Sequence, residues 1–364
     1  MKEERARIGK KSMNKERAIF REKPKVKERA NGREKPNMIE RNQEVNKMQE
    51  LKEAQQLAQV RHNPLAMLGD ASMAVERVRI AAQIRLSHLA KRGEACEDTR
   101  ELMDRAQLLE EWVDGRLAAY LSGHPAAWWF THVKGVGSEN IAKVISRIEA
   151  FGKWYDPGDE MIPPYVHRQP QEYSFLDRTT GETETKVGIW VAGIERLPTP
   201  SKLRKLAGLV PGMRKESGKI LPYDDELRML TWRLGLGLMR ATGKFYDFYN
   251  DYKDYLVRRE TGAGHQVVPT PRQRMCFNCN KEVVKKAAKF CPDCGGPLSL
   301  KTEPEGVLYQ GHLHEMATRR MRQLFMDLLW VAWRKGEGLP LRVPYAVEYG
   351  GHSRIMTCED MMDK

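Results

Sequence analysis

"HVKGVGSENIAKVISRIEAF", residues 132–151, joins a glycine-containing turn to a strongly amphipathic run. Four apolar residues of that run recur at three- and four-residue spacing, which places them on one helix face: Ile141, Val144, Ile145 and Ile148. The stretch therefore predicts a helix-hairpin-helix. Its two glycines let the turn pass close to another backbone, because glycine has no Cβ atom.

The same hairpin is a candidate nucleic-acid contact. The helix after the turn begins with backbone N–H groups that have no partner within the helix, and such groups can hold a phosphate without reading a base. Basic residues nearby add diffuse attraction. The candidate contact residues are Lys134, Gly135, Gly137, Lys143 and Arg147. The alternative is a turn that only connects two helices.

The charge of the chain also points to nucleic acid. Its 364 residues carry a formal net charge of +13, from 62 Lys and Arg against 49 Asp and Glu. Such a balance favours a polyanionic partner, since each cation placed on a phosphate releases a condensed counterion. Residues 1–60 hold 17 Lys and Arg against 10 Asp and Glu, so the excess is concentrated at this end. With few aromatic residues and no apolar period, this segment predicts a disordered basic arm, or a charged tail that only aids solubility.

Membrane association is not expected. No run approaches the ~20 apolar residues that a membrane-spanning helix requires, and the N-terminus lacks the apolar centre of a secretory signal. We therefore expect a cytoplasmic, nucleoid-associated protein.

Helical periodicity dominates the rest of the chain, so the expected fold class is mainly α, with a β-hairpin insert and a small zinc ribbon. The expected domains are a basic arm at 1–62, a helical hairpin or coiled coil at 63–125, a helix-hairpin-helix and helical core at 126–261, a β-hairpin insert at 151–192, a zinc ribbon at 262–304, a C-terminal core helix at 305–345 and a tail at 346–364. The hairpin at 63–125 breaks at Arg92 and Gly93 and serves either for dimerisation or as a core layer. The insert turns at "TTGET" between two alternating runs.

The ribbon is predicted by "CFNCNKEVVKKAAKFCPDCGG", residues 276–296. Two Cys-x-x-Cys pairs stand eleven residues apart, which is the spacing of a tetrahedral, structural Zn²⁺ site. The expected ligands are Cys276, Cys279, Cys291 and Cys294. A disulfide framework is not expected in a cytosolic chain, and a redox motif needs only one pair. Lysines on the intervening loop make the ribbon either a nucleic-acid contact or only a structural brace.

Four stretches of the chain, taken together and in their order along the sequence, resemble a known family. One of them is "LPTPSKLRKLAGLVPGMRKESGKI" at residues 197–220. The others are "VKGVGSENIAKVISRIE", "DELRMLTWRLGLGLMRATGKFYDFYNDYKDYL" and "HEMATRRMRQLFMDLLWVAW". This order resembles the C-terminal transposase domain of the bridge-RNA-guided insertion-sequence transposases. The tightest matches are the Ala-Gly-Leu-x-Pro element at 207–211 and the Ser-Gly element at Ser217 and Gly218.

The resemblance implies that Ser217 is a nucleophile that attacks a DNA phosphodiester and forms a phosphoserine link. Arg214, Lys215 and Lys219 would stabilise the crowded phosphate and contact the nucleic acid. It further implies DNA as substrate, a guide RNA as a possible partner, and Mg²⁺ as a possible cofactor of an active enzyme. A homo-oligomer is also possible. From the residues alone, Ser-Gly in a polar loop is ordinary turn chemistry.

The sequence departs from that family at its N-terminus, where the family carries a DEDD nuclease domain. Residues 1–125 show a charged arm and helices, with no series of strands that end in acids. Either a separate DEDD-type nuclease supplies the metal-binding carboxylates, or Asp224, Asp225 and Glu226 replace them, or the chain binds nucleic acid without cutting it. These three acids also suit the first turn of a helix for capping and dipole reasons alone.

Overall fold

The computed structural model describes residues 64–176, 181–213, 218–270, 274–276, 278–279, 281–283, 290–296, 298–300, 303–342 and 356–363. Within these residues the fold is mainly helical with small sheets, which confirms the predicted fold class at that level. The basic arm predicted at 1–62 lies outside the described residues.

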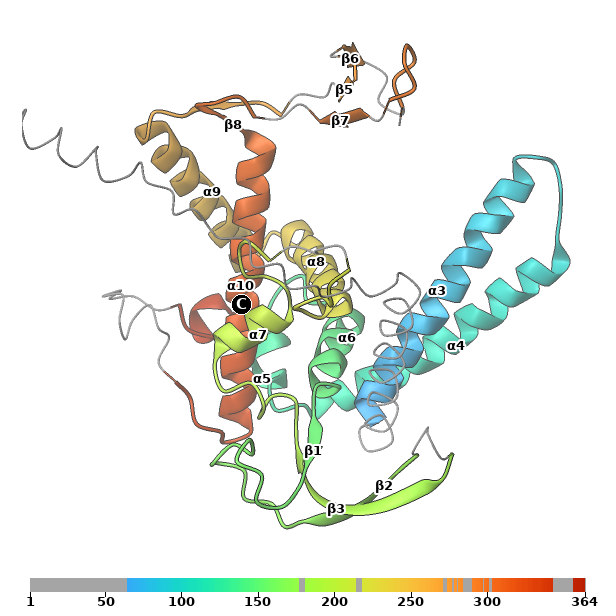
Figure 1. Cartoon of the computed structure of the whole chain (residues 1–364), viewed down its shortest axis with the longest axis vertical. Helices are drawn as coiled ribbons and strands as arrows, with labels where there is room; N and C mark the ends of the chain where they lie inside the picture. The colour runs from blue at the N-terminus through green and yellow to red at the C-terminus, as the bar shows by residue number, and fades with distance from the viewer. Residues whose placement is uncertain are drawn as a thin grey trace, which may run out of the picture. The chain divides into compact units, whose positions relative to one another are not determined.

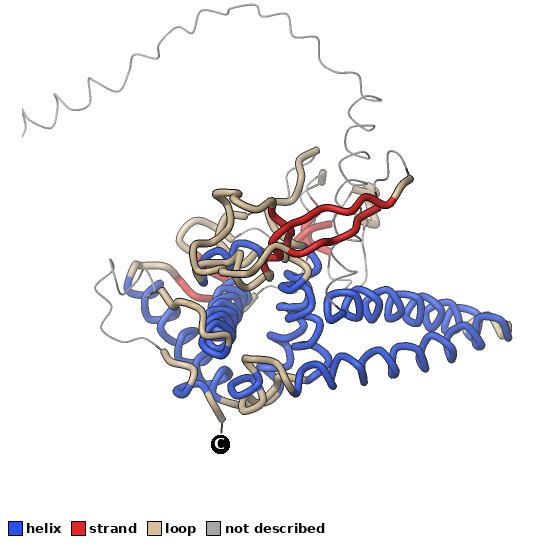
Figure 2. Tube along the Cα trace, turned by 90° about the horizontal axis from the view of Figure 1, so that it is seen from below, coloured by secondary structure: helices blue, strands red, loops and turns tan. Residues whose placement is uncertain are grey.

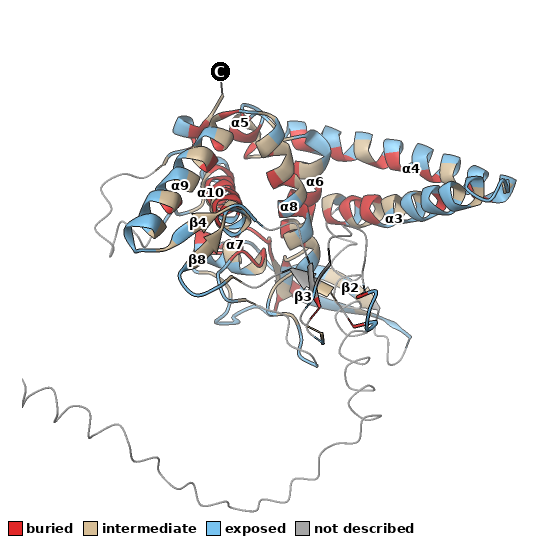
Figure 3. Cartoon of the chain, turned by 90° about the horizontal axis from the view of Figure 1, so that it is seen from above, coloured by how far each residue is buried: buried red, intermediate tan, exposed pale blue. Residues whose placement is uncertain are grey.

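Two long antiparallel helices come first, α3 (Pro64–Ala90) and α4 (Glu97–Ser122), and they pack along each other. The break between them includes the predicted Arg92 and Gly93, and Gly93 has a φ of +71°. Burial is concentrated at one end of the pair. Their outer turns are largely exposed, as the pale blue ribbon in Figure 3 shows, and Trp112 is 60% exposed.

The segment predicted as a helix-hairpin-helix contains α5 (Ala127–Phe130), a single helical turn of four residues, and α6 (Ser138–Glu149), joined by a turn at 131–137. Seven of the twelve residues of α6 are buried, because α3 and α4 cover one side of it and α8 (Asp225–Arg240) covers another (Figure 1). A helix enclosed in this way buries polar as well as apolar side chains. Because of this enclosure, charged residues in the middle of α6 lie between helices and not at the surface.

The turn passes very close to α8, as its glycines allow. Gly135 has a φ of +87°, and a Cβ atom there would lie 2.5 Å from the carbonyl oxygen of Gly237. A Cβ on Gly237 would in turn lie 2.5 Å from the carbonyl oxygen of Gly135. The two backbones are thus in direct contact, and neither position has room for a side chain.

The insert at 151–192 forms a three-stranded antiparallel sheet in the order β1-β3-β2, from β1 (Lys153–Tyr155), β2 (Gln171–Leu176) and β3 (Thr183–Val191). Leu176 pairs with Thr183, so β2 and β3 form the predicted hairpin, which extends beyond the helices in Figure 2. The strand β1 was not predicted. Its three residues pair with the end of β3 and anchor the hairpin beside α6.

The rest of the core comes from α7 (Pro200–Leu206), α9 (Lys244–Gly262) and α10 (Gln310–Gly336). The helix α10 packs against α7, α8 and α9. The sequence predicts Thr199 or Ser201 as the cap of α7, and Thr199 takes this role by accepting a hydrogen bond from the backbone N–H of Lys202. Helical spacing predicts Phe245 of α9 and Phe325 of α10 as partners in the core, and this is confirmed, since both are buried with ring centroids 5.4 Å apart. Short strands β4 (Gln266–Val268) and β8 (Val307–Tyr309) pair in parallel between α9 and α10.

The end of the chain belongs to the core, although its sequence predicted only a tail. Residues 356–363 contain the short 3₁₀ helix η1 (Glu359–Met361), and Cys358 and Met361 are each 3% exposed. The Cys358 carbonyl accepts a hydrogen bond from the buried Trp129 indole. The carboxylate of Asp363 accepts hydrogen bonds from the backbone N–H groups of Lys134 and Lys244, so this segment holds the 131–137 turn against α9.

Substitution of the two turn glycines tests the backbone contact. Gly135→Ser is expected to lower the free energy of unfolding by about 2–4 kcal/mol, because a side chain there combines a positive φ with an overlap against Gly237. Gly137→Ser is the matched control: Gly137 has a φ of −72°, open space around it and the N-cap position of α6, where serine is favoured. Urea unfolding measures both. Equal stabilities would contradict the contact.

Candidate metal centre and nucleic-acid interface

The four predicted cysteines come together in the ribbon. Cys276 ends β5 (Arg274–Cys276), which pairs with β6 (Glu282–Val283) and β7 (Leu298–Leu300) in a three-stranded sheet. The second pair lies in a tight turn, where the N–H of Gly295 bonds to the carbonyl of Cys291 and Gly295 has a φ of +67°. All four Sγ atoms lie within 4.8 Å of one another.

This donor set fits a zinc ion. The Sγ of Cys276 is 3.3 Å from that of Cys294, and the Sγ of Cys279 is 3.6 Å from that of Cys291. Four sulfur atoms bound tetrahedrally at ~2.3 Å from Zn²⁺ lie about 3.8 Å apart, whereas a disulfide bond is about 2.05 Å long. A hydrogen bond from the backbone N–H of Cys279 lowers the pKa of the Cys276 thiol to about 7, whereas burial raises the pKa of the Cys279 thiol.

Four protein ligands leave no open position, so a zinc ion here would be structural. The lysines predicted to make this ribbon a nucleic-acid contact lie mostly outside the described residues. Lys281 is described, and its ammonium group pairs with Asp293 at 2.9 Å.

Zinc content tests the centre directly. We expect about one zinc ion per chain in the purified protein and a loss of that zinc in Cys276→Ser, because three sulfur ligands hold the ion far less tightly than four. Cys96→Ser is the matched control, since Cys96 is a free cysteine outside the cluster. Elemental analysis after gel filtration measures both. Full zinc in Cys276→Ser would exclude this ligand set.

The loop that contains Ser217 is closed at its base. Arg214, Lys215 and Ser217 lie outside the described residues, but the chain on both sides of them is described. The backbone N–H of Asp224 donates to the carbonyl of Leu206 over 2.8 Å. The buried amide of Gln323 in α10 donates to the carbonyl of Leu209 over 2.7 Å.

Gly208 completes this base. It has a φ of +63°, and a Cβ atom there would lie 2.8 Å from the ring of Tyr223 on the returning side of the loop. The two ends of the loop therefore leave and rejoin the core at one place. Lys219, the last of the predicted basic residues of the loop, is exposed.

The turn at 131–137 keeps one exposed cation. The side chain of Lys134 is exposed, although its backbone N–H bonds to Asp363. Gly137 and the first residues of α6 are exposed too, whereas Gly135 faces α8. A phosphate contact at Lys134 and Gly137 stays a prediction.

Lys143 and Arg147 lie in a different setting from the predicted one. The Lys143 side chain is 0% exposed, and its ammonium group lies 2.7 Å from Glu139 and 3.5 Å from Glu76 of α3. Because α3 covers this face of α6, the ammonium group does not reach a surface where DNA would lie. The charge that was predicted to attract a phosphate is instead paired with carboxylates inside the protein.

Arg147 is 10% exposed and surrounded by acids. Its guanidinium group lies 2.8 Å from Asp224, 3.2 Å from Asp70 and 3.2 Å from Glu226. Burial alone would lower the pKa of Arg147, but these three carboxylates raise it above its ordinary value. Arg147 thus joins α3, α6 and α8 and is a structural cation.

Of the three acids at residues 224–226, Asp224 is the N-cap of α8, which is the capping role considered from the sequence. The Asp224 carboxylate accepts a hydrogen bond from the backbone N–H of Leu227 at the start of α8 and also pairs with Arg147. Burial raises the pKa of Asp224. Glu226 pairs with Arg77 and Arg147. Two of the three acids are thus engaged with cations, which disfavours them as a local metal site.

A second acidic group was not anticipated. Carboxylates of Glu110, Asp114 and Glu139 lie within 4.8 Å of one another between α4 and α6. Each already has a partner: Arg79 for Glu110, Ser72 for Asp114 and Lys143 for Glu139. Internal pairing accounts for this cluster without a metal ion.

Comparisons of the chain with protein-family models, with curated proteins and with solved structures found no match. Among the described helices, none is long and apolar enough to cross a membrane.

Two substitutions separate the structural cation from the exposed one. Arg147→Met is expected to lower the free energy of unfolding by about 3–5 kcal/mol, because it leaves three carboxylates without their cation. Lys134→Met is the control and should change stability by less than about 0.5 kcal/mol. If Lys134 contacts a phosphate, this variant also lowers the slope of log K against log salt for duplex DNA by about 1. Unchanged stability in Arg147→Met would refute the structural assignment.

Proposed function

We propose that this chain binds DNA and that Ser217 attacks a DNA phosphate, forming a covalent phosphoserine link as the first half of strand exchange. The net charge of +13, the exposed start of α6 and the resemblance to transposases support this proposal. In this reading the protein is a serine transposase or recombinase.

The observation that carries the proposal is the closed base of the Ser217 loop. Hydrogen bonds to Leu206 and Leu209 fix both ends of the loop on α7, α8 and α10. Functional residues are commonly carried by loops held on a rigid scaffold, because the scaffold sets their position while the loop reaches the substrate. Gly208 ends α7 in the left-handed conformation that is common after a helix, and the buried amide of Gln323 additionally ties the start of the loop to α10.

The chemistry conserves the energy of the broken bond. The Ser217 hydroxyl oxygen bonds to phosphorus and loses its proton, while the bond to the 3′ oxygen breaks and that oxygen leaves as a hydroxyl. Attack by another 3′ hydroxyl on the phosphoserine reverses these steps and releases the serine. Arg214, Lys215 and Lys219 would stabilise the charge that builds on the phosphate.

We infer that activation of the hydroxyl comes from a separate polypeptide. A serine hydroxyl needs a base or a metal ion, and among the described acids near the loop, Asp224 and Glu226 are held by Arg147. A separate DEDD-type nuclease with bound Mg²⁺, with or without a guide RNA, fits this requirement.

The same pairing of acids favours a second candidate function. Without a partner, the chain would be a non-catalytic DNA- or RNA-binding protein with the helical core of a transposase and a zinc ribbon. Both functions include salt-dependent nucleic-acid binding, so binding alone does not separate them.

Covalent attachment separates the two functions. The wild type, Ser217→Ala and the control Ser201→Ala, which alters an exposed serine of α7, are each expressed with the DNA that flanks the gene and with any neighbouring nuclease. Cells are lysed in denaturant and DNA that remains bound to protein is quantified. We expect attachment in the wild type and Ser201→Ala and none in Ser217→Ala. Absence from all three, with tight binding retained, would favour the non-catalytic function.

A further inference from the structure

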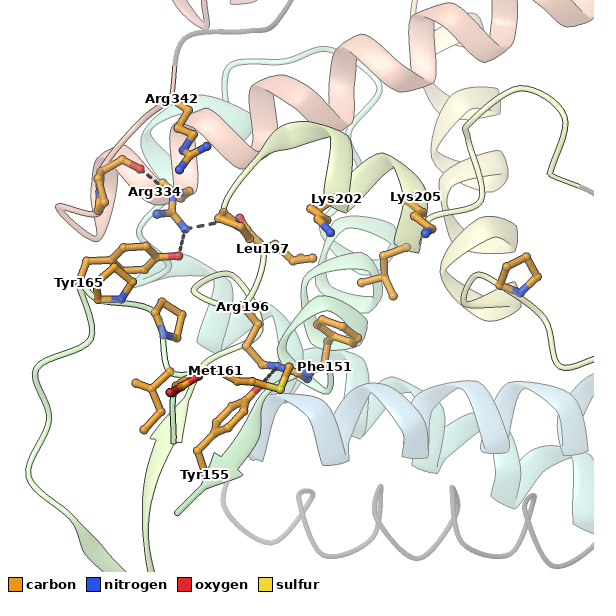
Figure 4. Close-up of a pocket in the computed structure, with 18 residues that line it drawn as sticks. Phe151, Tyr155, Met161, Tyr165, Arg196, Leu197, Lys202, Lys205, Arg334 and Arg342 are labelled. Atoms are coloured by element: carbon orange, nitrogen blue, oxygen red, sulfur yellow. Dashed lines mark hydrogen bonds between the residues drawn. The ribbon is translucent and has the colours of Figure 1, made fainter. Parts of the chain in front are cut away.

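A cavity of about 740 Å³ opens beside α7. Its walls come from the segment after β1, from the segment that leads into α7, from α7 itself and from the end of α10 (Figure 4). Its volume lies within the range of 300–1,000 Å³ typical of sites for small organic ligands. Neither the zinc centre nor the 131–137 turn contributes to it.

The cavity is strongly cationic. The basic residues that line it are Arg196, Lys202, Lys205, Arg334 and Arg342, and the one acid among its lining residues is Glu160. None of these five cations forms an ion pair with a described carboxylate, in contrast to Lys143 and Arg147. Five cations against one acid favour an anion in the space between them.

Two of the arginines form a fixed floor. Arg334 is 1% exposed and donates to the carbonyls of Ile194 and Pro340, which joins α10 to the segment before α7. Arg196 donates to the hydroxyl of Tyr155. Both guanidinium groups therefore bond to neutral oxygens, which position them without cancelling their charge.

The floor also carries flat apolar surface. The guanidinium of Arg334 lies 4.9 Å from the centre of the Tyr165 ring, and that of Arg196 lies 4.2 Å from the centre of the Phe151 ring. Arg334 also lies 5.0 Å from the centre of the Trp330 ring, so its guanidinium is held between two rings. The aromatic rings of Phe151 and Tyr165 line the cavity, and a nucleobase can stack on such a ring irrespective of its sequence.

The rim differs from the floor. Lys202 and Lys205 are exposed on α7 and Arg342 is exposed after α10, and Figure 4 shows these side chains around the same space. Internal structure accounts for Arg196 and Arg334, which hold segments together. It does not account for the three rim cations, which form no ion pair with a described acid.

The cavity adjoins the base of the Ser217 loop. Leu206 and Pro222 line it, and they stand on the two sides of the loop base, next to the hydrogen bond from Asp224 to Leu206. A ligand in the cavity would therefore lie beside the point where that loop leaves the core.

We propose that this cavity binds an unpaired nucleotide of a DNA strand, with its phosphate at Lys202, Lys205 and Arg342 and its base against the aromatic floor. This rests on the proposed function, because strand exchange separates strands next to the serine and an unpaired segment has to be held there. A base within a duplex is stacked on its neighbours and is not free to enter such a cavity.

Binding of a fluorescent 12-mer of deoxythymidine tests the proposal, with the matching duplex and free thymidine monophosphate as further ligands. Lys202→Ala/Lys205→Ala is compared with the wild type and with Lys91→Ala/Arg92→Ala, which removes the same charge from the exposed turn after α3. Anisotropy is measured over a range of salt concentrations. A second readout replaces one base with 5-iodouracil and maps the peptide that crosslinks to it.

We expect the Lys202/Lys205 variant to bind the single strand at least about tenfold more weakly, with a salt slope lower by about 0.7, as the loss of one phosphate contact requires. Duplex binding and the Lys91/Arg92 variant should match the wild type. The crosslinked peptides should include residues 151–165. Equal weakening in both variants, or crosslinks only at other segments, would overturn the proposal, and competition by thymidine monophosphate as strong as by the 12-mer would identify a free-nucleotide site instead.

Measurement of covalent attachment beside strand binding separates this inference from the proposed function. If strand binding requires Lys202 and Lys205 but the wild type attaches no DNA, the cavity assignment stands and the role of Ser217 is refuted. If the wild type attaches DNA but strand binding does not require Lys202 and Lys205, the role of Ser217 stands and the cavity assignment is refuted.

Discussion

The enclosure of α6 is the constraint on which the rest of the structure depends. Two charged side chains of this helix, Lys143 and Arg147, lie on its covered sides, and burial of an uncompensated charge costs several kcal/mol. Lys143 and Arg147 are therefore met by acids from α3, α6 and α8. Because these acids come from different helices, the ion pairs fix the positions of the helices relative to one another as well as neutralising the charge.

Close backbone approach complements these ion pairs. A Cβ atom on Gly69 of α3 would lie 1.9 Å from the hydroxyl of Ser146 on α6, and Gly135 meets Gly237 of α8 in the same manner. At both contacts glycine lets two segments come nearer than side chains would allow. The short distances bring the acids of α3 and α8 within reach of the cations of α6.

Local signals in the sequence predicted much of the fold because they depend on neighbouring residues. Helical periodicity indicated the long helices, the turn at "TTGET" indicated the β2–β3 hairpin, and Thr199 and Asp224 were recognisable caps. The cysteine pairs predicted their own cluster, since the ligand spacing is itself local.

The remaining features depend on partners far away in the chain. The acid that meets Arg147 at 2.8 Å is 77 residues distant, and Asp363 bonds to Lys134 across 229 residues. Periodicity identifies the apolar face of a helix but not whether a second layer covers its polar face. For this reason Lys143 and Arg147, at four-residue spacing, suggested a surface, whereas in the folded chain both side chains are buried among acids.

The same distinction changes how the charge of this protein is interpreted. A net charge of +13 measures a tendency to bind polyanions but says nothing about where they bind, because a cation held by internal carboxylates no longer attracts a phosphate strongly. Sorting the cations by their internal partners removes Lys143 and Arg147 from the set that can hold DNA. Lys202 and Lys205, on α7 at the base of the Ser217 loop, remain in that set. The residues that build the core thus also determine which positive charges are left to act outside it.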